Sequence, residues 1–219
     1  QRIESVLHQT YQNIEVIILD DCSSDNSQHV IHEYKGHTLI TKIVFNAKNS
    51  GSAFKQWKLG VEMARGEWIW IAESDDYADT QYLETALNAV ENRSNIGLVY
   101  CDSNIVTNSI VSEETFASIK NKKFKTSRWS DSHINSGLDE IENYLLLGGT
   151  INNTSAVLFR RDIFLTSQPF DRDMRYIGDK YAFVKVLAKS DVAYIKEKLN
   201  YFRNPFNTKH ADRFVFYFY

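Results

Sequence analysis

Two apolar segments of strand length end abruptly in clusters of acidic residues. Residues 14–21 read IEVIILDD, and residues 68–76 read WIWIAESDD. Apolar runs of this length are typical of strands that are buried on both faces of a parallel sheet. Open parallel sheets bind ligands at the carboxyl ends of their strands. The sequence therefore predicts that Asp20–Asp21 and Asp75–Asp76 lie near one another at one edge of an α/β sheet.

The first half of the chain alternates strands with helices around these two segments. Strands are expected at residues 14–19, 42–45, 68–72 and 97–101, and helices at 3–7, 25–34, 53–64 and 81–91. This alternation predicts an α/β fold with a mostly parallel sheet. Sheets of this kind usually begin with a strand, whereas this chain begins with a helical pattern. An N-terminal strand is therefore predicted to be missing from the sequence.

The second half of the chain has a less regular pattern. Residues 109–135 are polar and contain the basic segment KNKKFK at 120–125. Helices are expected at 138–147, 162–166 and 179–189, and strands at 155–159 and within 192–203. Because we find no internal repeat, low-complexity tract or Gly/Ser linker, residues 1–219 are predicted to form a single domain.

The composition is that of an ordinary globular protein. Hydrophobic residues make up 43% of the chain and charged residues 24%, with a net charge of −3. This charge gives no reason to expect a nucleic-acid partner. The two cysteines, Cys22 and Cys101, are too few for a disulfide framework, so a reducing compartment is expected. No apolar run approaches the roughly 20 residues that span a bilayer.

The acidic clusters indicate a divalent cation. Neighbouring carboxylates repel one another and raise each other's pKa, and a bound cation relieves that repulsion. Mg²⁺ and Mn²⁺ prefer oxygen ligands, and Mg²⁺ commonly combines one or two carboxylates with phosphate oxygens. Since no Gly-rich phosphate loop is found, we expect a metal ion, rather than the backbone of such a loop, to hold a diphosphate. The structural alternative is that these acids only cap the next helices, as Asp25 and Asp79 are expected to do.

Several motifs, in order, resemble those of one enzyme family. The segment SVLHQTYQNIEVIILDDCSSDNS resembles the opening of the family 2 glycosyltransferases, which have the GT-A fold. The segments NSG, MARGEWIWIAESDD, NNTSAVLFRRDIF and YIGDKYAFVKVLAKSDVAYIKEKLNYFR continue the resemblance over nearly the whole chain. It implies a Rossmann-like sheet, with residues 1–108 binding a nucleotide-sugar. Residues 109–219 would then bind the acceptor and supply the catalytic base.

The resemblance also implies roles for individual acids. Asp21 matches the acid that hydrogen-bonds the nucleotide base, usually uracil. Asp75 matches the acid near the ribose and the metal, and Asp76 matches the direct metal ligand. Asp179, in YIGDKY, matches the catalytic base, although it could instead cap the helix that follows it.

Two further residues are assigned to the nucleotide site, and three positions depart from the family pattern. Asp20, beside Asp21, and Gly51, in the Asn-x-Gly loop, are expected to contribute to nucleotide binding. Many members have Arg-Asn where this chain has Trp57–Lys58. Many also have a metal-contacting histidine where this chain has Pro205, which leaves His210 as a candidate replacement.

The function implied by this resemblance is inverting transfer of a sugar from a nucleotide donor, UDP being the first choice. The cofactor would be Mn²⁺ or Mg²⁺, and the acceptor a glycan or a lipid-linked sugar of a bacterial surface polysaccharide pathway. The expected location is the cytoplasm, with peripheral association at the inner face of the membrane compatible with it. Two alternatives stay open: a non-catalytic GT-A module that binds nucleotide or glycan, and a nucleotidyltransferase. The second would usually need a Gly-rich basic loop, which we do not find.

Overall fold

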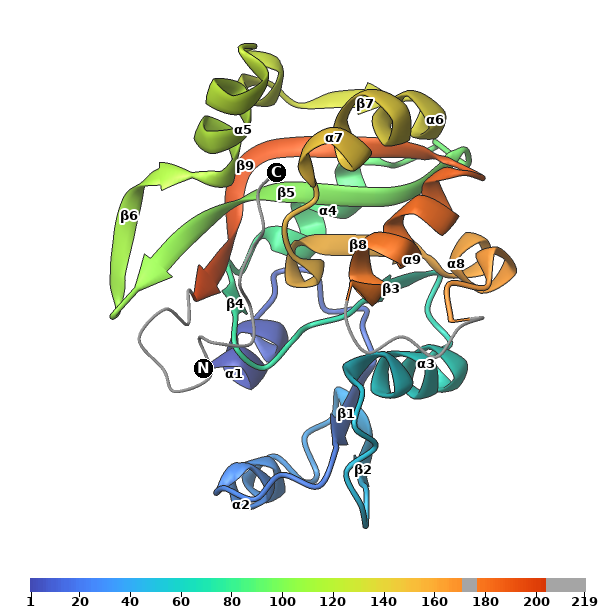
Figure 1. Cartoon of the computed structure of the whole chain (residues 1–219). Helices are drawn as coiled ribbons and strands as arrows, with labels where there is room; N and C mark the ends of the chain where they lie inside the picture. The colour runs from blue at the N-terminus through green and yellow to red at the C-terminus, as the bar shows by residue number, and fades with distance from the viewer. Residues whose placement is uncertain (171–176, 204–219) are drawn as a thin grey trace.

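The computed structural model describes residues 1–170 and 177–203, which form two sheets with helices packed around them (Figure 1). After helix α1 (Arg2–Leu7), the small sheet contains two parallel strands, β1 (Val16–Asp20) and β2 (Ile40–Phe45), with helix α2 (Ser27–Glu33) between them in the chain. Helix α3 (Ala53–Met63) then leads back to the large sheet.

The large sheet is mixed. Its strand order is β3 (Trp68–Trp70), β8 (Val157–Arg160), β5 (Ile96–Thr107), β9 (Asp191–Arg203) and β4 (Tyr77–Ala78), with β6 (Ile110–Thr115) paired to β5 and β7 (His133–Asn135) paired to β9. Only the β5–β9 pairing is parallel among these strands, and the other pairings are antiparallel. The predicted α/β class is therefore confirmed, whereas the described large sheet is not mostly parallel.

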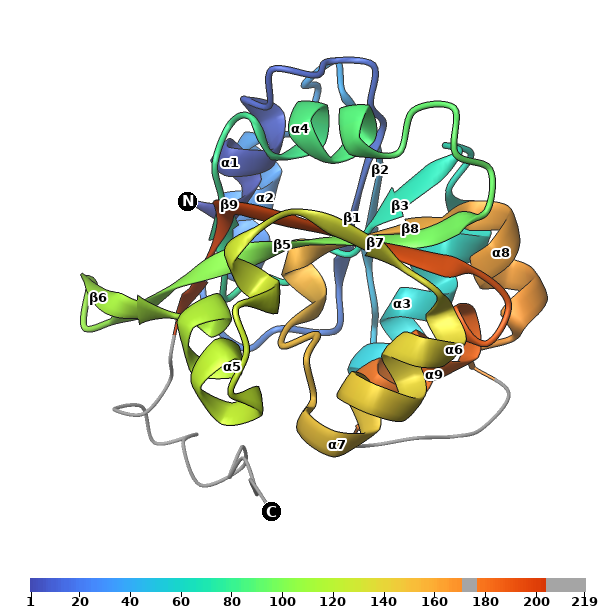
Figure 2. The same cartoon turned by 90° about the horizontal axis from the view of Figure 1, so that it is seen from above.

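Alternating residues of β5 separate two apolar cores. Leu98 and Tyr100 pack into one core, and Val99 and Cys101 pack into the other, because successive strand residues point to opposite faces. The first core receives side chains from α5 (Phe116–Phe124), α8 (Arg161–Ser167), α9 (Gly178–Leu187) and the π-helical segment Ile141–Leu145, which lies between α6 (Gly137–Glu140) and α7 (Leu146–Gly148). Helix α4 (Tyr82–Ala89) covers the second core, on the opposite face of the sheet (Figure 2).

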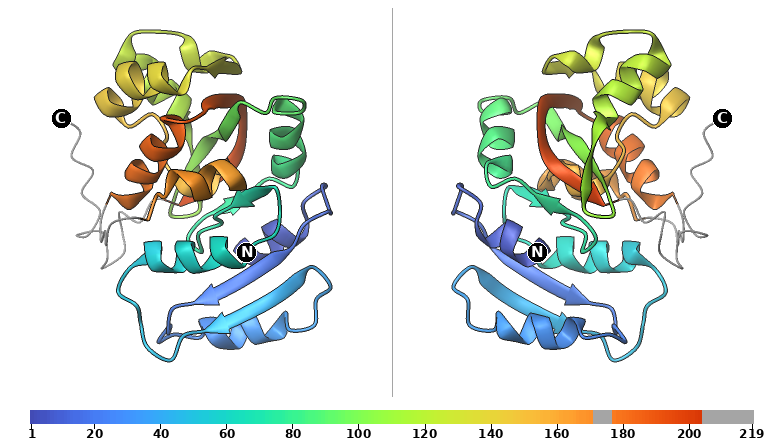
Figure 3. Two further views of the ribbon diagram at one scale, coloured as in Figure 1. Left: turned by 90° about the vertical axis from the view of Figure 1, so that its right-hand side faces the viewer. Right: turned by 90° about the vertical axis from the view of Figure 1, so that its left-hand side faces the viewer.

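A wide gap separates the small sheet from the large one. Within the described residues, β1 pairs only with β2, and β3 pairs only with β8, so each keeps a free edge. A cavity of about 3420 Å³ lies between them and is lined by residues 14–19 on one side and 68–72 on the other. Ordinary ligand pockets measure about 300–1,000 Å³, so this cavity is several times larger than one of them. The predicted additional strand stays a prediction. Figure 3 shows the small sheet set apart from the large one.

Most of the expected helices and strands are present, with two main differences. Residues 109–135, for which no helix or strand was predicted, contain β6, α5 and β7. Strand β5 extends to Thr107, well beyond the expected end at residue 101. The strand predicted within residues 192–203 is present as β9. The proposed division at residue 108 falls in the β5–β6 hairpin, and the domain organisation remains a prediction. In the described part of the chain, no helix is both long and apolar enough to cross a bilayer.

Candidate active site

The acidic loop after β3 presents two neighbouring acids in different environments. Asp76 is only 2% exposed, whereas Asp75 is exposed and lines the cavity. One oxygen of Asp76 accepts a hydrogen bond from Asn153 Nδ2, and the other accepts one from the backbone N–H of Arg203 at 3.1 Å. Asp76 is therefore held inside the protein, and Asp75 is the acid that a ligand can reach.

The end of β9 fixes the shape of this loop. The Arg203 guanidinium donates hydrogen bonds to the carbonyl oxygens of Ser74, at 2.9 Å, and Asp75. Next to this loop, where β4 pairs with β9, the rings of Tyr77 and Tyr201 stack with their centroids 4.5 Å apart. Because these contacts use the backbone of the loop, the Asp75 carboxylate stays available at the cavity.

The acids of this loop repel one another. Burial, followed by the charges of Asp75, Asp76 and Asp179, raises the pKa of Glu73 to about 8. Burial and the charge of Asp75 likewise raise the pKa of Asp76 to about 6. A bound divalent cation would stabilise the ionised forms of these carboxylates. In residues 1–170 and 177–203, no three His, Cys, Asp or Glu side chains converge to hold a metal ion.

Asp21, predicted to contact the nucleotide base, organises the loop that follows β2. Its carboxylate accepts hydrogen bonds from Asn46 Nδ2 at 2.7 Å, Ser50 N at 2.9 Å, Ser50 Oγ at 2.7 Å and Gln56 Nε2 at 2.9 Å. Burial raises the pKa of Asp21, but the bonds from Ser50 and Asn46 outweigh it, so the pKa is lowered. Asp21 therefore holds the loop after β2 rather than capping the next helix, as the structural alternative expected, and its contact with a base remains a prediction.

Asp20 and Gly51 shape the same side of the cavity. Asp20 is 4% exposed and accepts hydrogen bonds from Ser23 N at 3.1 Å and Gln28 Nε2 at 2.7 Å. Gly51 has a left-handed backbone with φ +75°, which glycine adopts without strain, and nothing lies within 4 Å of its Cβ position. Both residues line the cavity, as does Asp75, but they belong to the small sheet's side of it. Their contact with a nucleotide remains a prediction.

Asp179 faces the acidic loop from helix α9. It lines the same cavity as Glu73 and Asp75, and its charge contributes to the raised pKa of Glu73. Ile177, rather than Asp179, occupies the N-cap position of α9, and no side chain caps that helix end. The alternative that Asp179 serves as a helix cap is therefore not what the structure shows. Its role as catalytic base remains a prediction.

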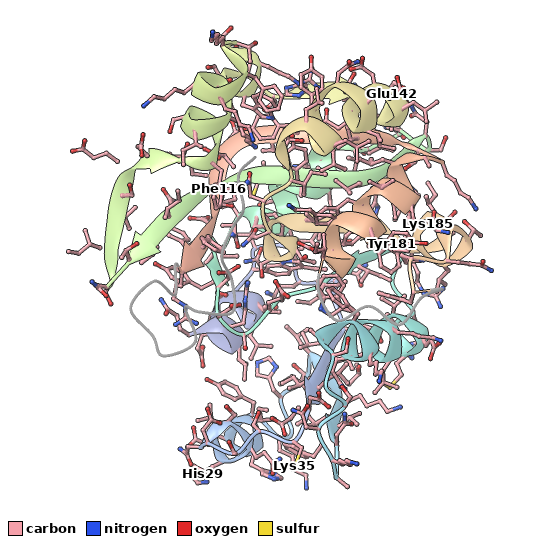
Figure 4. All side chains as sticks on the ribbon, in the orientation of Figure 1. His29, Lys35, Phe116, Glu142, Tyr181 and Lys185 are labelled. Atoms are coloured by element: carbon pink, nitrogen blue, oxygen red, sulfur yellow. The ribbon has the colours of Figure 1, made fainter. Side chains whose placement is uncertain are left out.

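The packing of α9 on α3 sets the position of Asp179. Gly178 is buried, and a Cβ there would lie 2.7 Å from ring atoms of Phe54. Only glycine lets the two helices approach this closely. Tyr181 and Lys185 extend from the next turns of α9, with Lys185 Nζ 5.6 Å from the centre of the Tyr181 ring (Figure 4). Neither of these two residues lines the cavity.

Comparison with known proteins assigns the family. Residues 1–164 match the family model described as Glycosyl transferase family 2. The chain belongs to glycosyl transferase family 2. Glycosyltransferase GlyG of Streptococcus pneumoniae is 34% identical over 91 residues, which cover 42% of this chain and 30% of GlyG. The Escherichia coli enzyme WfaP, named a UDP-Glc:alpha-D-GlcNAc-diphosphoundecaprenol beta-1,3-glucosyltransferase, is 34% identical over 89 residues, covering 41% of this chain and 34% of WfaP. The matches span about a third of the length of these relatives.

Solved structures confirm the predicted GT-A fold. The structure of S. aureus TarS 1-349 in complex with UDP-GlcNAc superposes with a TM-score of 0.72. The superposition covers 98% of this chain and 57% of TarS 1-349, at 16% sequence identity. At that identity the likeness shows the fold alone.

The structure brings two further residues to the acidic loop of this family 2 chain. Asn153 lies in the segment NNTSAVLF, but nothing in the sequence paired it with Asp76. Arg2 is 8% exposed, donates from Nε to the Glu73 carbonyl oxygen at 2.8 Å, and lies over the Trp70 ring at 5.4 Å. Pairings of this kind depend on tertiary folding, so no local signal predicted them. Pro205 and His210 lie outside the described residues.

Proposed function

We propose that this chain forms the donor site and part of the acceptor site of an inverting glycosyltransferase. The donor is a nucleotide-sugar, with UDP as its nucleotide, and the acceptor is a glycan or a lipid-linked sugar. The observation that carries the proposal is the placement of Asp179 opposite Glu73 and Asp75 on one cavity. The reaction needs a base for the acceptor hydroxyl, and acids on the other side could hold a metal ion that neutralises the diphosphate.

Asp75 is the best candidate for a direct metal ligand, with Glu73 beside it. The resemblance assigned that role to Asp76, but both oxygens of Asp76 already accept hydrogen bonds inside the protein. Asp75 is exposed at the cavity, so its oxygens are accessible to Mn²⁺ or Mg²⁺. Such an ion, when bound, would neutralise the charge that develops on the departing nucleoside diphosphate. Asp76 then acts as the buried support of the loop.

Asp179 acts on the acceptor in this proposal. Its carboxylate removes the proton of an acceptor hydroxyl while the oxygen of that hydroxyl forms a bond to the anomeric carbon. The bond between the anomeric carbon and the diphosphate breaks in the same displacement, which inverts the anomeric centre. No covalent intermediate with the protein is needed.

The names of relatives support UDP as the nucleotide and a lipid-linked sugar as the acceptor. WfaP is named for UDP-glucose and a diphosphoundecaprenol-linked acceptor, and TarS has been crystallised with UDP-GlcNAc. Asp20, Asp21 and Gly51 would hold the nucleotide through the loop that they shape. The site of action proposed from these acceptors is the cytoplasmic face of the membrane.

Isothermal titration of UDP into the full-length protein tests the donor site. We expect UDP to bind about 10- to 100-fold more tightly with Mn²⁺ than with EDTA, the range typical of disrupted metal sites. Asp75→Ala should abolish this gain. Asp131→Ala removes an exposed acid that does not line the cavity and should keep the gain. Equal affinity in Mn²⁺ and EDTA for the unmodified protein would contradict the metal's role.

A further inference from the structure

Large aliphatic side chains are exposed at one end of the molecule. Leu146 and Leu147, in α7, are 68% and 61% exposed, and Ile177, at the start of α9, is 64% exposed. The two helices adjoin there, since the Cβ position of Gly149 lies 3.5 Å from Lys180 Nζ. Adjacent exposed aliphatic residues of this size indicate a surface that binds something.

Lysines surround these aliphatic residues. Lys122, Lys123 and Lys125 lie at the end of α5, and all three are exposed. The end of α5 contacts α7, because Lys123 Nζ donates to the Gly148 carbonyl oxygen at 3.4 Å. Lys180, the fourth lysine, is also exposed. Two acids lie close to these residues: Glu142, one turn before Leu146 (Figure 4), and Asp179, between Ile177 and Lys180. The four lysines outnumber these two acids.

We propose that this α7 surface, formed by Leu146, Leu147, Ile177 and the four lysines, docks on an anionic lipid bilayer. Aliphatic side chains that enter the boundary between headgroups and acyl chains, flanked by lysines that bind anionic headgroups, are the features of an interfacial membrane anchor. A protein partner fits less well, because lysine is depleted in protein–protein interfaces. The positive charge of the surface therefore favours anionic lipid as its binding partner.

The α7 surface borders the candidate active site. Leu146, Leu147, Ile177 and Lys180 line the same cavity as Asp179. Docking through this surface would place the acceptor side of the cavity at the headgroups, where the sugar of a lipid-linked acceptor lies. This consequence rests on the proposed function, whereas the docking itself needs neither donor nor metal.

Cosedimentation of the full-length protein with vesicles tests the docking. We expect binding to vesicles of phosphatidylcholine mixed with phosphatidylglycerol, and much weaker binding to phosphatidylcholine alone. Lys122→Glu/Lys125→Glu should weaken binding by at least about 25-fold, since each surface lysine contributes about fivefold. High salt should also weaken binding, because it screens the attraction between the lysines and the anionic headgroups.

A matched pair of double variants isolates the aliphatic contribution. Leu146→Ser/Leu147→Ser should reduce vesicle binding by about tenfold or more. Ile110→Ser/Val111→Ser alters two residues of β6 that are 71% and 47% exposed, and it should bind as the unmodified protein does. The proposal is overturned if the leucine variant binds vesicles as tightly as this control, or if the unmodified protein ignores anionic vesicles. UDP affinity, measured on Lys122→Glu/Lys125→Glu, which alters two residues that do not line the cavity, should not change, which separates failure of docking from failure of the donor site.

Discussion

Asn153 donates a hydrogen bond from Nδ2 to Oδ2 of Asp76 and so joins residues that lie 77 positions apart in the chain. The Oδ1 atom of Asn153 accepts from Ala156 N at 3.2 Å and from Asn200 Nδ2 at 3.4 Å. The amide therefore ties the acidic loop to the segment before β8 and to β9. These contacts hold Asp76 in place, whereas Asp75, the next residue toward the N-terminus, faces the cavity.

Replacing Asn153 with alanine should destabilise the protein. Asp76 would keep the Arg203 N–H as a partner but lose its other hydrogen bond while remaining buried. An unsatisfied buried acceptor costs about 1–3 kcal/mol, more when it is charged. Urea unfolding of Asn153→Ala should show this loss. Asn143→Ala removes an exposed asparagine that bonds Asp139, and it should change stability by no more than about 0.5 kcal/mol. Equal midpoints for the two variants would show that the Asn153 bond contributes nothing.

The sequence could locate the acidic loop but could not distinguish its members. Apolar runs and acidic ends are local features, so the strands before Asp20 and Asp75 were predictable from the printed residues. Asp75 and Asp76 are adjacent and chemically identical, and their environments differ because Asn153, from the segment before β8, and Arg203, from β9, bond to Asp76. The assignment of the direct ligand therefore had to rely on resemblance.

Helix α5 shows a second feature that the local sequence pattern does not predict. The segment KNKKFK reads as a solvated basic stretch, yet Lys120 is 4% exposed. Its Nζ atom lies 5.1–5.3 Å from the ring centres of Tyr100, Trp129 and Tyr194 and donates to the Thr150 carbonyl oxygen at 3.1 Å. Two of those rings, Tyr100 and Tyr194, come from the distant strands β5 and β9. Pairing directions in the large sheet, such as the antiparallel β5–β8 contact, are likewise fixed by packing across the whole domain.

Lys120 should make stability depend on pH above neutrality. Burial lowers the pKa of Lys120 from 10.5 to about 8, although the charges of Asp102 and Glu140 oppose this shift. Between these values the unfolded chain binds more protons than the folded chain, so folding becomes more favourable as the pH rises. Relative to Lys120→Met, the unmodified protein should therefore gain up to about 3 kcal/mol of stability between pH 8 and 10.5.

The matched control for this titration is Lys122→Met. Lys122 is exposed on the same helix, so its removal should leave the pH profile of the unmodified protein unchanged. Chemical denaturation at several pH values measures both differences. A Lys120→Met profile that runs parallel to the unmodified one would mean that the buried amine keeps its ordinary pKa.

Gly178 should be intolerant of a side chain because of Phe54. A methyl group at Gly178 would meet the Phe54 ring at 2.7 Å, so α9 or the ring must shift. Overpacking of this kind typically costs about 1–3 kcal/mol, and it would also displace the neighbouring Asp179. Gly178→Ala should therefore lower both the unfolding midpoint and the rate of sugar transfer.

The double variant Gly178→Ala/Phe54→Leu tests the cause of that loss. If the ring contact is responsible, a smaller side chain at Phe54 should recover part of the stability and rate, and the two substitutions should not be additive. Additive losses would place the effect of Gly178→Ala in the backbone of α9 rather than in this contact.

The final prediction separates chemistry from binding at Asp179. Asp179→Asn keeps the size of the side chain but removes its basicity. Loss of a positioned base lowers rates by about 10²- to 10⁴-fold, so sugar transfer should fall in that range. UDP affinity in Mn²⁺ should change little, because Asp179 acts on the acceptor. Asp75→Ala should also lose activity, but it should lose UDP affinity as well.

The measurements that distinguish these outcomes are transfer rate, UDP affinity and unfolding midpoint on the same preparations. Asp179 lies within the first turn of α9 and does not cap it, so Asp179→Asn should unfold at nearly the same midpoint as the unmodified protein. A transfer rate near that of the unmodified protein would remove Asp179 from the mechanism. Joint loss of UDP affinity and stability would instead assign it a structural role, and the chain would then be better described as a nucleotide-binding module without turnover.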